Sequence, residues 1–285
     1  MGWWNVIDVS DWIIAREETR GKREKVWLKS PKGELHLRKE CRATCPNETP
    51  LELLAFQIMR EFGVPAPVTA VCEWNKGRKR GLLSKSFVEK GENKHLGSTI
   101  LSRDPDYDQE DRYAHTVSRV RNALTSLAQS VDQDPVELLL PMMRILYVDC
   151  LLGLADRHQE NWSVLESQSG YKLAPVYDLD SCLGGQQIDA APLVVDRPTN
   201  KVAAFANGCP SGFGDGEKFI KMRFLPAILS SWPEWTQVQS ELKCQMAELD
   251  FRELVLEIPQ EWLSEDRKLL ACCLLEYRKE WLLKC

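Results

Sequence analysis

The chain has 285 residues, of which 44% are hydrophobic and 28% charged, and its formal net charge is −5. This length is sufficient for one two-lobed domain or two small domains with a substantial core, and the composition is that of an ordinary globular protein. The negative net charge disfavours a nucleic-acid-binding protein, which commonly presents a basic surface. We therefore expect no direct binding to nucleic acid.

The ten cysteines give no metal-binding or disulfide pattern. Cys41 and Cys45 are followed by no second Cys or His pair at metal-ligand spacing. The first residues, Met1-Gly2-Trp3-Trp4, lack the basic region and the apolar run of a signal peptide. We therefore expect reduced, mostly buried thiols in a cytoplasmic protein.

The N-terminal part of the chain alternates in the manner of β-strands. Two strands that flank a turn at Pro31-Lys32-Gly33 predict a hairpin. The segment 47–50, with Pro50 in the first turn, predicts the start of a helix that ends at Gly63. The expected strands cover residues 6–9, 12–14, 25–28, 35–39, 68–74 and 81–88, and the expected helix covers 51–62.

The C-terminal part is mainly helical after a polar connector over residues 89–112. Charged residues and Pro141 interrupt the apolar run 136–155, so we expect a buried helix there rather than a membrane span. The pattern predicts an α+β fold with a β-rich N-terminal lobe, 1–88, and a helical C-terminal lobe, 89–285. The expected helices cover 113–130, 134–154, 216–231, 234–249 and 261–284, and a short strand pair covers 162–165 and 171–174.

The residues that indicate chemistry lie between 150 and 184. Asp156 directly follows the long apolar helix, Asn161 comes five residues later, and Asp178 follows the predicted strand pair. Phosphoryl transfer by kinases uses a loop carboxylate near the acceptor hydroxyl, an amide that ligates magnesium and a second metal-binding carboxylate in this order. An isolated Asp in a loop is more often a turn residue. The three residues in order, framed by a helix and a hairpin, favour the kinase interpretation.

The stretch DRHQENW…LAPVYDLDSCLG closely resembles the catalytic segment of HipA-like kinases, in which D-R-H-x-x-N-W precedes A-P-x-x-D-x-x-x-x-L-G. Phosphatidylinositol-type lipid kinases share a similar D-R-H-x-x-N core. The resemblance extends over about residues 25–185. It implies a two-lobed protein-kinase-like fold that uses ATP and Mg²⁺.

The same resemblance implies a role for each matching residue. Asp156 would orient the acceptor hydroxyl or take up its proton, and Asn161 and Asp178 would bind magnesium. Lys39 would contact the α- and β-phosphates and would be held by Glu52.

Residues between the lobes would surround the adenine: backbone groups near Ser86, Phe87 and Val88 would meet its edge. Other basic residues compete with Lys39 for the phosphate role, namely Lys29, Lys32, Arg38 and Lys85. We expect His158 to support the loop structurally, and Asp180 either to assist the metal or to cap a turn.

The chain also departs from the family pattern. It is too short for the complete extra N-terminal subdomain of HipA toxins, and Gly21 is the only glycine in the segment 16–25 that precedes the Lys strand. A glycine-rich phosphate loop and its phosphorylatable Ser motif are therefore missing from the sequence. No A-P-E-like motif ends an activation segment, and the stretch 184–215 is expected to serve as the substrate-facing loop.

Three functions follow from these observations. The first is a Ser/Thr protein kinase with a protein substrate, and an antitoxin partner if the chain is the toxin of a toxin–antitoxin pair. The second is a kinase for a small molecule or a lipid headgroup. The third is a catalytically inactive kinase-fold binding module, against which the complete set of Asp156, Asn161 and Asp178 argues.

Overall fold

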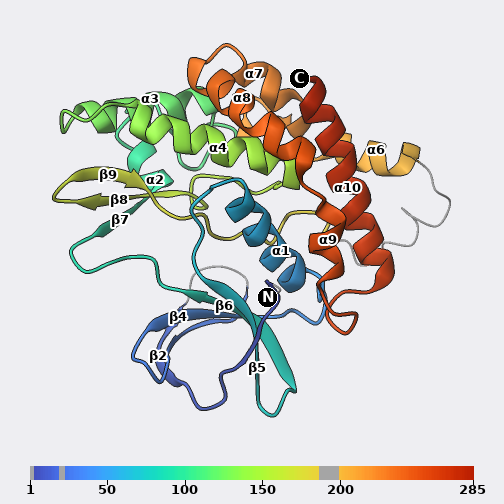
Figure 1. The fold of residues 1–285 in the computed structure, drawn as a ribbon. Coiled ribbons are helices and arrows are strands. Elements are labelled where there is room, and N and C mark those ends of the chain that lie inside the picture. Colours follow the sequence, from blue (N-terminus) through green and yellow to red (C-terminus); the bar gives the residue numbers. More distant parts are fainter. Residues whose placement is uncertain (1–2, 19–22, 186–198) are drawn as a thin grey trace.

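The computed structural model describes residues 3–18, 23–185 and 199–285. A β-sheet lobe and a helical lobe lie one above the other, and helix α1 (Glu48–Glu61) lies between them (Figure 1). The α+β organisation expected from the sequence is therefore confirmed. The segment 86–92 connects the lobes, since the sheet of the first lobe ends at Lys85 and the next strand begins at Asn93.

The N-terminal lobe is built on one six-stranded sheet in the order β1-β5-β6-β4-β3-β2. Among the described strands, only β1 and β5 pair in parallel. The predicted hairpin of β3 and β4 is confirmed, with Trp27 opposite Leu37. Its strands are β1 (Val6–Asp8), β2 (Ile13–Glu18), β3 (Lys25–Lys29), β4 (Leu35–Glu40), β5 (Thr69–Trp74) and β6 (Lys79–Lys85).

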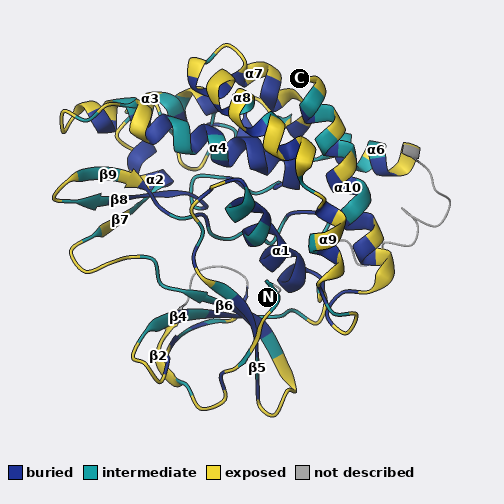
Figure 2. Cartoon of the chain, viewed as in Figure 1, coloured by how far each residue is buried: buried dark blue, intermediate teal, exposed yellow. Residues whose placement is uncertain are grey.

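Helix α1 is the most enclosed element near the interface of the lobes. Eleven of its 14 residues are buried, so it contacts protein on nearly every side (Figure 2). It packs against β5, β6 and the long helix α4 (Val136–Leu152). Gly63 ends it at φ +67°, a left-handed conformation that glycine adopts without steric cost. Because α1 packs against both lobes, its polar side chains lie at the interface between them.

The helical lobe is organised around α4, which contacts α1, α3, α7, α8 and α10. Twelve of its 17 residues are buried, which confirms the predicted core helix. Within the part of the chain described, no helix is long and apolar enough to cross a membrane. The other helices are α2 (Gly97–Leu101), α3 (Val117–Gln129), α6 (Thr199–Gly208), α7 (Leu225–Leu229), α8 (Pro233–Glu248), α9 (Phe251–Leu256) and α10 (Glu265–Lys284).

Two small sheets complete this lobe. The predicted strand pair forms β8 (Ser163–Ser167) and β9 (Gly170–Leu173), and β7 (Asn93–Leu96) adds to its edge. The second sheet pairs β10 (Pro210–Gly214) with β11 (Phe219–Lys221). The expectation of a continuous helix over 216–231 is wrong, since that range contains β11, a 3₁₀ turn (Met222–Phe224) and only the short α7.

The reason for the β10–β11 hairpin is tertiary. A Cβ on Gly214 would lie 2.2 Å from the backbone oxygen of Tyr113, so this strand approaches residues 113–115 more closely than a side chain permits. Helices α6 and α9 were not expected either. Of the expected substrate-facing loop 184–215, residues 186–198 lie outside the described residues.

All ten cysteines are free, as expected for reduced thiols. The expectation that most are buried is wrong, because only Cys72, Cys150 and Cys182 are buried, and the remaining seven are partly or fully exposed. Several of these seven sit on the outer parts of helices, where one face of the helix meets solvent.

Candidate active site

The loop that follows α4 is held by a buried ion pair. Arg157, which is 1% exposed, donates from Nε and Nη2 to Asp149 over 2.8 and 2.9 Å. Its third nitrogen, Nη1, donates to the backbone oxygen of Asn161 over 2.6 Å. Breaking a buried pair by removing one partner costs about 3–5 kcal/mol. The loop between Asp156 and Asn161 is therefore tied rigidly to the core of α4.

The end of α4 is fixed from the opposite side by the last helix. Gly153 adopts φ +61°, and a Cβ there would lie 2.2 Å from the guanidinium carbon of Arg278. Arg278 Nη1 donates to the backbone oxygen of Leu152 over 3.0 Å and so satisfies a carbonyl at the helix end. The predicted helix 261–284 thus contributes to the position of the loop through one buried arginine.

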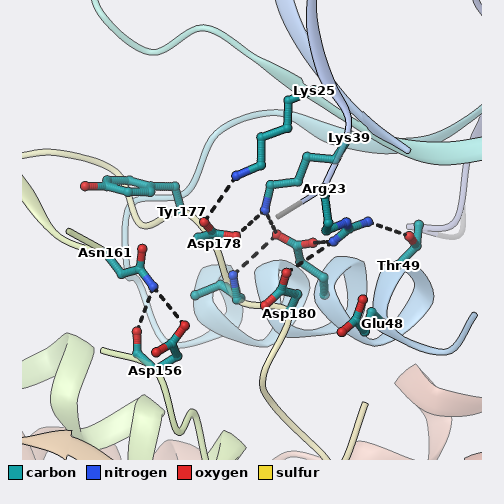
Figure 3. Close-up of polar contacts among 12 residues, drawn as sticks. Arg23, Lys25, Lys39, Glu48, Thr49, Asp156, Asn161, Tyr177, Asp178 and Asp180 are labelled. Carbon is teal, nitrogen blue, oxygen red and sulfur yellow. Dashed lines mark hydrogen bonds and ion pairs between the residues drawn. The ribbon is translucent and has the colours of Figure 1, made fainter. Parts of the chain in front are cut away.

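Asp156 and Asn161 face each other across this loop (Figure 3). Asn161 Nδ2 donates to the backbone oxygen of Asp156 over 2.7 Å and approaches its Oδ2 at 3.4 Å. His158 Nε2 lies 3.4 Å from Asp156 Oδ1, while its Nδ1 accepts the backbone N–H of Glu160. His158 thus has the supporting position that the sequence suggested. The Asp156 side chain is 51% exposed.

Asp178 follows β9 and projects toward the N-terminal lobe. Its φ of +58° is unusual for a residue with a side chain and directs the carboxylate to the lysines of the sheet. Lys39 Nζ lies 2.5 Å from Oδ1 and Lys25 Nζ lies 3.5 Å from Oδ2. Burial by itself raises the pKa of Asp178, but the charges of Lys39 and Lys25 outweigh it and hold the pKa well below its usual range.

Lys39, on β4, joins α1 to Asp178. Its Nζ lies 2.7 Å from Oε1 of Glu52, which is fully buried. Arg23 occupies the other oxygen of Glu52 at 3.0 Å and extends the network to Asp180 at 3.3 Å. Burial lowers the pKa of Lys39, yet the attraction of Glu52, then of Asp178, raises it overall above its ordinary value. Lys39 therefore stays protonated.

The rival basic residues lie elsewhere. Lys85 pairs with Glu34 at 2.7 Å, and the guanidinium of Arg38 covers the ring of Trp74 at 3.9 Å. Lys29 and Lys32 are exposed near the β3–β4 turn. Of the candidates named from the sequence, only Lys39 contacts both Glu52 and Asp178.

The connector between the lobes places one aromatic side chain, Phe87, beside Tyr177. Ser86 donates its backbone N–H to the oxygen of Leu35 over 2.8 Å, which ends the pairing with the sheet. Phe87 stacks on Tyr177 with ring centroids 6.1 Å apart, and Val88 is 39% exposed. Phe87 therefore adjoins the residue before Asp178.

A cavity of about 330 Å³ opens on the other side of Asp156. Its lining combines the loop after α4 with the β10–β11 hairpin and includes Arg112. The guanidinium of Arg112 lies over the rings of Tyr113 and Phe219, at 4.7 and 5.2 Å. The cavity is lined by Arg112, Ala155, Asp156, His158, Gln159, Glu160, Pro210, Gly212 and Phe219.

A buried histidine links that hairpin to Trp162, the residue that follows Asn161. His115 Nδ1 donates to the backbone oxygen of Gly212 over 3.1 Å, and its Nε2 accepts from Trp162 Nε1 over 3.1 Å. It stacks on Phe213 at 4.6 Å. This pattern requires a neutral imidazole. Burial lowers the pKa of His115 to about 4, which agrees with the hydrogen bonds.

The comparisons with known proteins now assign the chain to a family. Residues 18–258 match the HipA-like C-terminal domain. The chain belongs to this family. The structural neighbours are kinases, so the expected two-lobed protein-kinase-like fold is also confirmed. A search of curated proteins gives no match.

Three solved structures show how far the fold is shared. The proinflammatory kinase CtkA of Helicobacter pylori superimposes with a TM-score of 0.82 at 19% identity, over 98% of this chain and 96% of that one. HipA of Shewanella oneidensis MR-1, solved with HipB and operator DNA, gives 0.51 at 18% identity, over 96% and 65%. The Golgi casein kinase gives 0.50 at 11% identity, over 97% and 74%.

Sequence reasoning missed two basic residues of the cluster and the arginine that holds the loop. Arg23 was noted only within the segment 16–25, Lys25 only as the first residue of the predicted strand 25–28, and Arg157 only as part of the motif. The sequence does show several basic residues before β3. The acidic residues that pair with them are distant in sequence, so no local pattern indicates the pairing.

The donor set fits magnesium together with a nucleotide. Asp178 offers a carboxylate. Asn161 uses its Nδ2 for the contact with Asp156, and its Oδ1 accepts no hydrogen bond from any described residue. Mg²⁺ commonly takes one or two protein oxygens and completes its shell with phosphates and water. Among the described residues, no group of three His, Cys, Asp or Glu could hold a metal by itself.

Proposed function

We propose that this chain is an ATP- and magnesium-dependent kinase that transfers the γ-phosphate to a Ser or Thr hydroxyl of a protein. The observation that supports it best is the convergence of Lys39, Glu52 and Asp178 from three separated segments, with Asp156 and Asn161 beside them (Figure 3). Ionisable groups with strongly shifted pKa values that converge at the interface of two lobes are typical of functional sites.

Each residue has a distinct task in this proposal. Lys39, oriented by Glu52, positions the phosphates, and Asp156 orients the acceptor hydroxyl and takes up its proton. Bound by Asn161 and Asp178, magnesium would neutralise the charge on the phosphates. Phe87 would form a wall for the adenine, and Ser86 and Val88 would present backbone groups to its edge.

The cavity beside Asp156 is where the acceptor would enter. Its volume of about 330 Å³ is near the lower end for ligand pockets, about 300–1,000 Å³. That size suits one side chain of a protein substrate, and it also suits a small hydroxyl compound, which is the second candidate acceptor. From the family relationship we also infer a protein partner of the antitoxin class, which co-purification with the tagged chain would reveal.

The test is phosphate transfer from labelled ATP with and without magnesium. Asp178→Asn should abolish turnover, and Asp156→Asn should strongly reduce it while nucleotide binding persists. Asp250→Asn is the matched control, because Asp250 caps α9 far from the cluster and Asn is an equally good cap. Wild-type turnover in both active-site variants would refute the proposal.

Binding is checked separately by a thermal-shift titration. A ligand at a hundredfold excess over its dissociation constant stabilises the folded state by about 2.7 kcal/mol. Wild type should respond to ATP only with magnesium, and Asp178→Asn should lose that dependence. Mass spectrometry of the labelled products then separates a protein acceptor from a small molecule.

A further inference from the structure

Arg112 lines the cavity beside Asp156 and is exposed to solvent. Its guanidinium lies over the rings of Tyr113 and Phe219, at 4.7 and 5.2 Å, and these two rings contact each other edge to face at 5.1 Å. Phe219 belongs to β11 and Tyr113 to the connector before α3, so tertiary packing brings the rings together. A side chain that is already held loses less conformational entropy when it binds a ligand. Arg112 is therefore positioned before an acceptor enters.

No carboxylate of the described residues balances the charge of Arg112. None of the ion pairs within the described chain includes it, although several acidic residues lie close to it in the sequence. Asp111 Oδ1 accepts the backbone N–H of Tyr113 over 2.9 Å, and Asp108 Oδ1 accepts that of Glu110 over 2.9 Å. These carboxylates cap backbone N–H groups instead of pairing with the arginine. The guanidinium thus keeps its N–H donors available for a ligand.

The other charges that line the cavity give it a polarity. Asp156 and Glu160 both belong to the lining. Asp156 lies 3.4 Å from His158 and, in the proposed function, meets the acceptor hydroxyl. Burial, and then the charge of Glu160, raises the pKa of Tyr107, so this second carboxylate acts on the connector. Because both carboxylates repel an anion and Arg112 attracts it, an anionic group on the acceptor would lie against the guanidinium.

We propose that Arg112 selects acceptors that carry an anionic group, a carboxylate or a phosphate, close to the hydroxyl that receives the phosphoryl group. A guanidinium presents paired N–H groups that match two oxygens of either anion. The inference rests on the proposed kinase function and narrows its acceptor to a Ser or Thr beside an acidic or already phosphorylated residue. The contact forms equally in the ground state and the transition state, so it lowers KM and leaves kcat nearly constant.

The test compares short peptides with a central Ser or Thr in which one flanking position is Asp, Asn, Lys or phosphoserine, at saturating MgATP. At the position that faces Arg112, the Asp peptide should have a kcat/KM about fivefold above that of the Asn peptide, as for an exposed ion pair of good geometry. The difference should lie in KM and should shrink as salt is added. Comparison of the Asp and phosphoserine peptides tells which of the two anions is preferred.

Three variants assign the preference to a residue. Arg112→Met should bring the ratio of the Asp to the Asn peptide close to one, and Arg112→Glu should favour the Lys peptide instead. Arg223→Met is the matched control. Arg223 is also exposed and lies over an aromatic ring, that of Phe224 at 4.6 Å, but it does not line the cavity. Its removal takes the same charge from the same lobe and should leave the ratio as in wild type.

Each other outcome overturns the inference. Equal kcat/KM for the Asp and Asn peptides at every position in wild type would refute it, and this result does not depend on the folding of any variant. The phosphorylation of those peptides would still uphold the proposed function. A preference that Arg112→Met retains, or that Arg223→Met loses to the same extent, would place the selection elsewhere. If wild type transfers phosphate to none of the peptides, the protein-kinase proposal fails and this inference with it.

Discussion

Acidification should destabilise the folded protein through His115, which is buried between Trp162 and the β10–β11 hairpin. Its pKa is lowered from 6.5 to about 4 by burial, and further by His158 and Arg157, while its bond to Gly212 acts in the opposite direction. Because the folded pKa lies below the unfolded one, the unfolded chain binds more protons between pH 6.5 and 4. Stability therefore falls as the pH falls through this window.

The size of the effect follows from the two pKa values. The free energy of unfolding should drop by about 2 kcal/mol between pH 7.5 and 5, and by about 3 kcal/mol once the pH is below 4. Urea unfolding at pH 7.5 and 5 measures it. His115→Asn is the reference, since its amide can donate to Gly212 and does not titrate. Other titrating groups contribute to both proteins and cancel in the comparison.

The expected result is that wild type loses about 2 kcal/mol more than His115→Asn over this pH range. Equal losses, within about 0.5 kcal/mol, would refute the reasoning, because they would mean that the buried imidazole accepts a proton in the folded state at no cost. The hydrogen bond that His115 receives from Trp162 would then not exist as described.

Three further perturbations test other parts of the structure. Glu52→Gln leaves the two buried cations, Arg23 and Lys39, facing a neutral group. The free energy of unfolding, measured with urea, should fall by about 3 kcal/mol or more. A fall below about 1 kcal/mol would contradict the buried network. Gly212→Ala places a Cβ 2.6 Å from the backbone nitrogen of Arg157 and should abolish activity. Gly216→Ala is the control, since Gly216 also has a positive φ but open space around it, and this variant should retain activity. Equal activity losses in the two variants would disprove the close approach of Gly212 to Arg157. Phe219→Ala should raise the KM for the acceptor without changing MgATP affinity; the reverse pattern would place the acceptor elsewhere.

Much of the fold could be predicted from the sequence because the patterns that indicate it involve neighbouring residues. The apolar periodicity of α4, the turn between β3 and β4 and the strand pair β8–β9 each depend on fewer than about 25 neighbouring residues. The β10–β11 hairpin could not be predicted from the sequence. Its glycines permit close approaches to the backbones of Tyr113 and Arg157, which are distant in sequence. A helical pattern was therefore expected where tertiary contacts impose strands.

The sequence by itself determined the family, the α+β organisation and the order of Asp156, Asn161 and Asp178. These three residues could be recognised because they lie within one continuous stretch of the chain. Only the tertiary structure decided which basic residues join them. Lys39 lies 139 positions from Asp178 and Arg23 lies 157 positions from Asp180, and they meet through strand register and the packing of α1 between the lobes. Attraction between charges acts through space and leaves no local pattern, so these contacts follow from the folded chain alone.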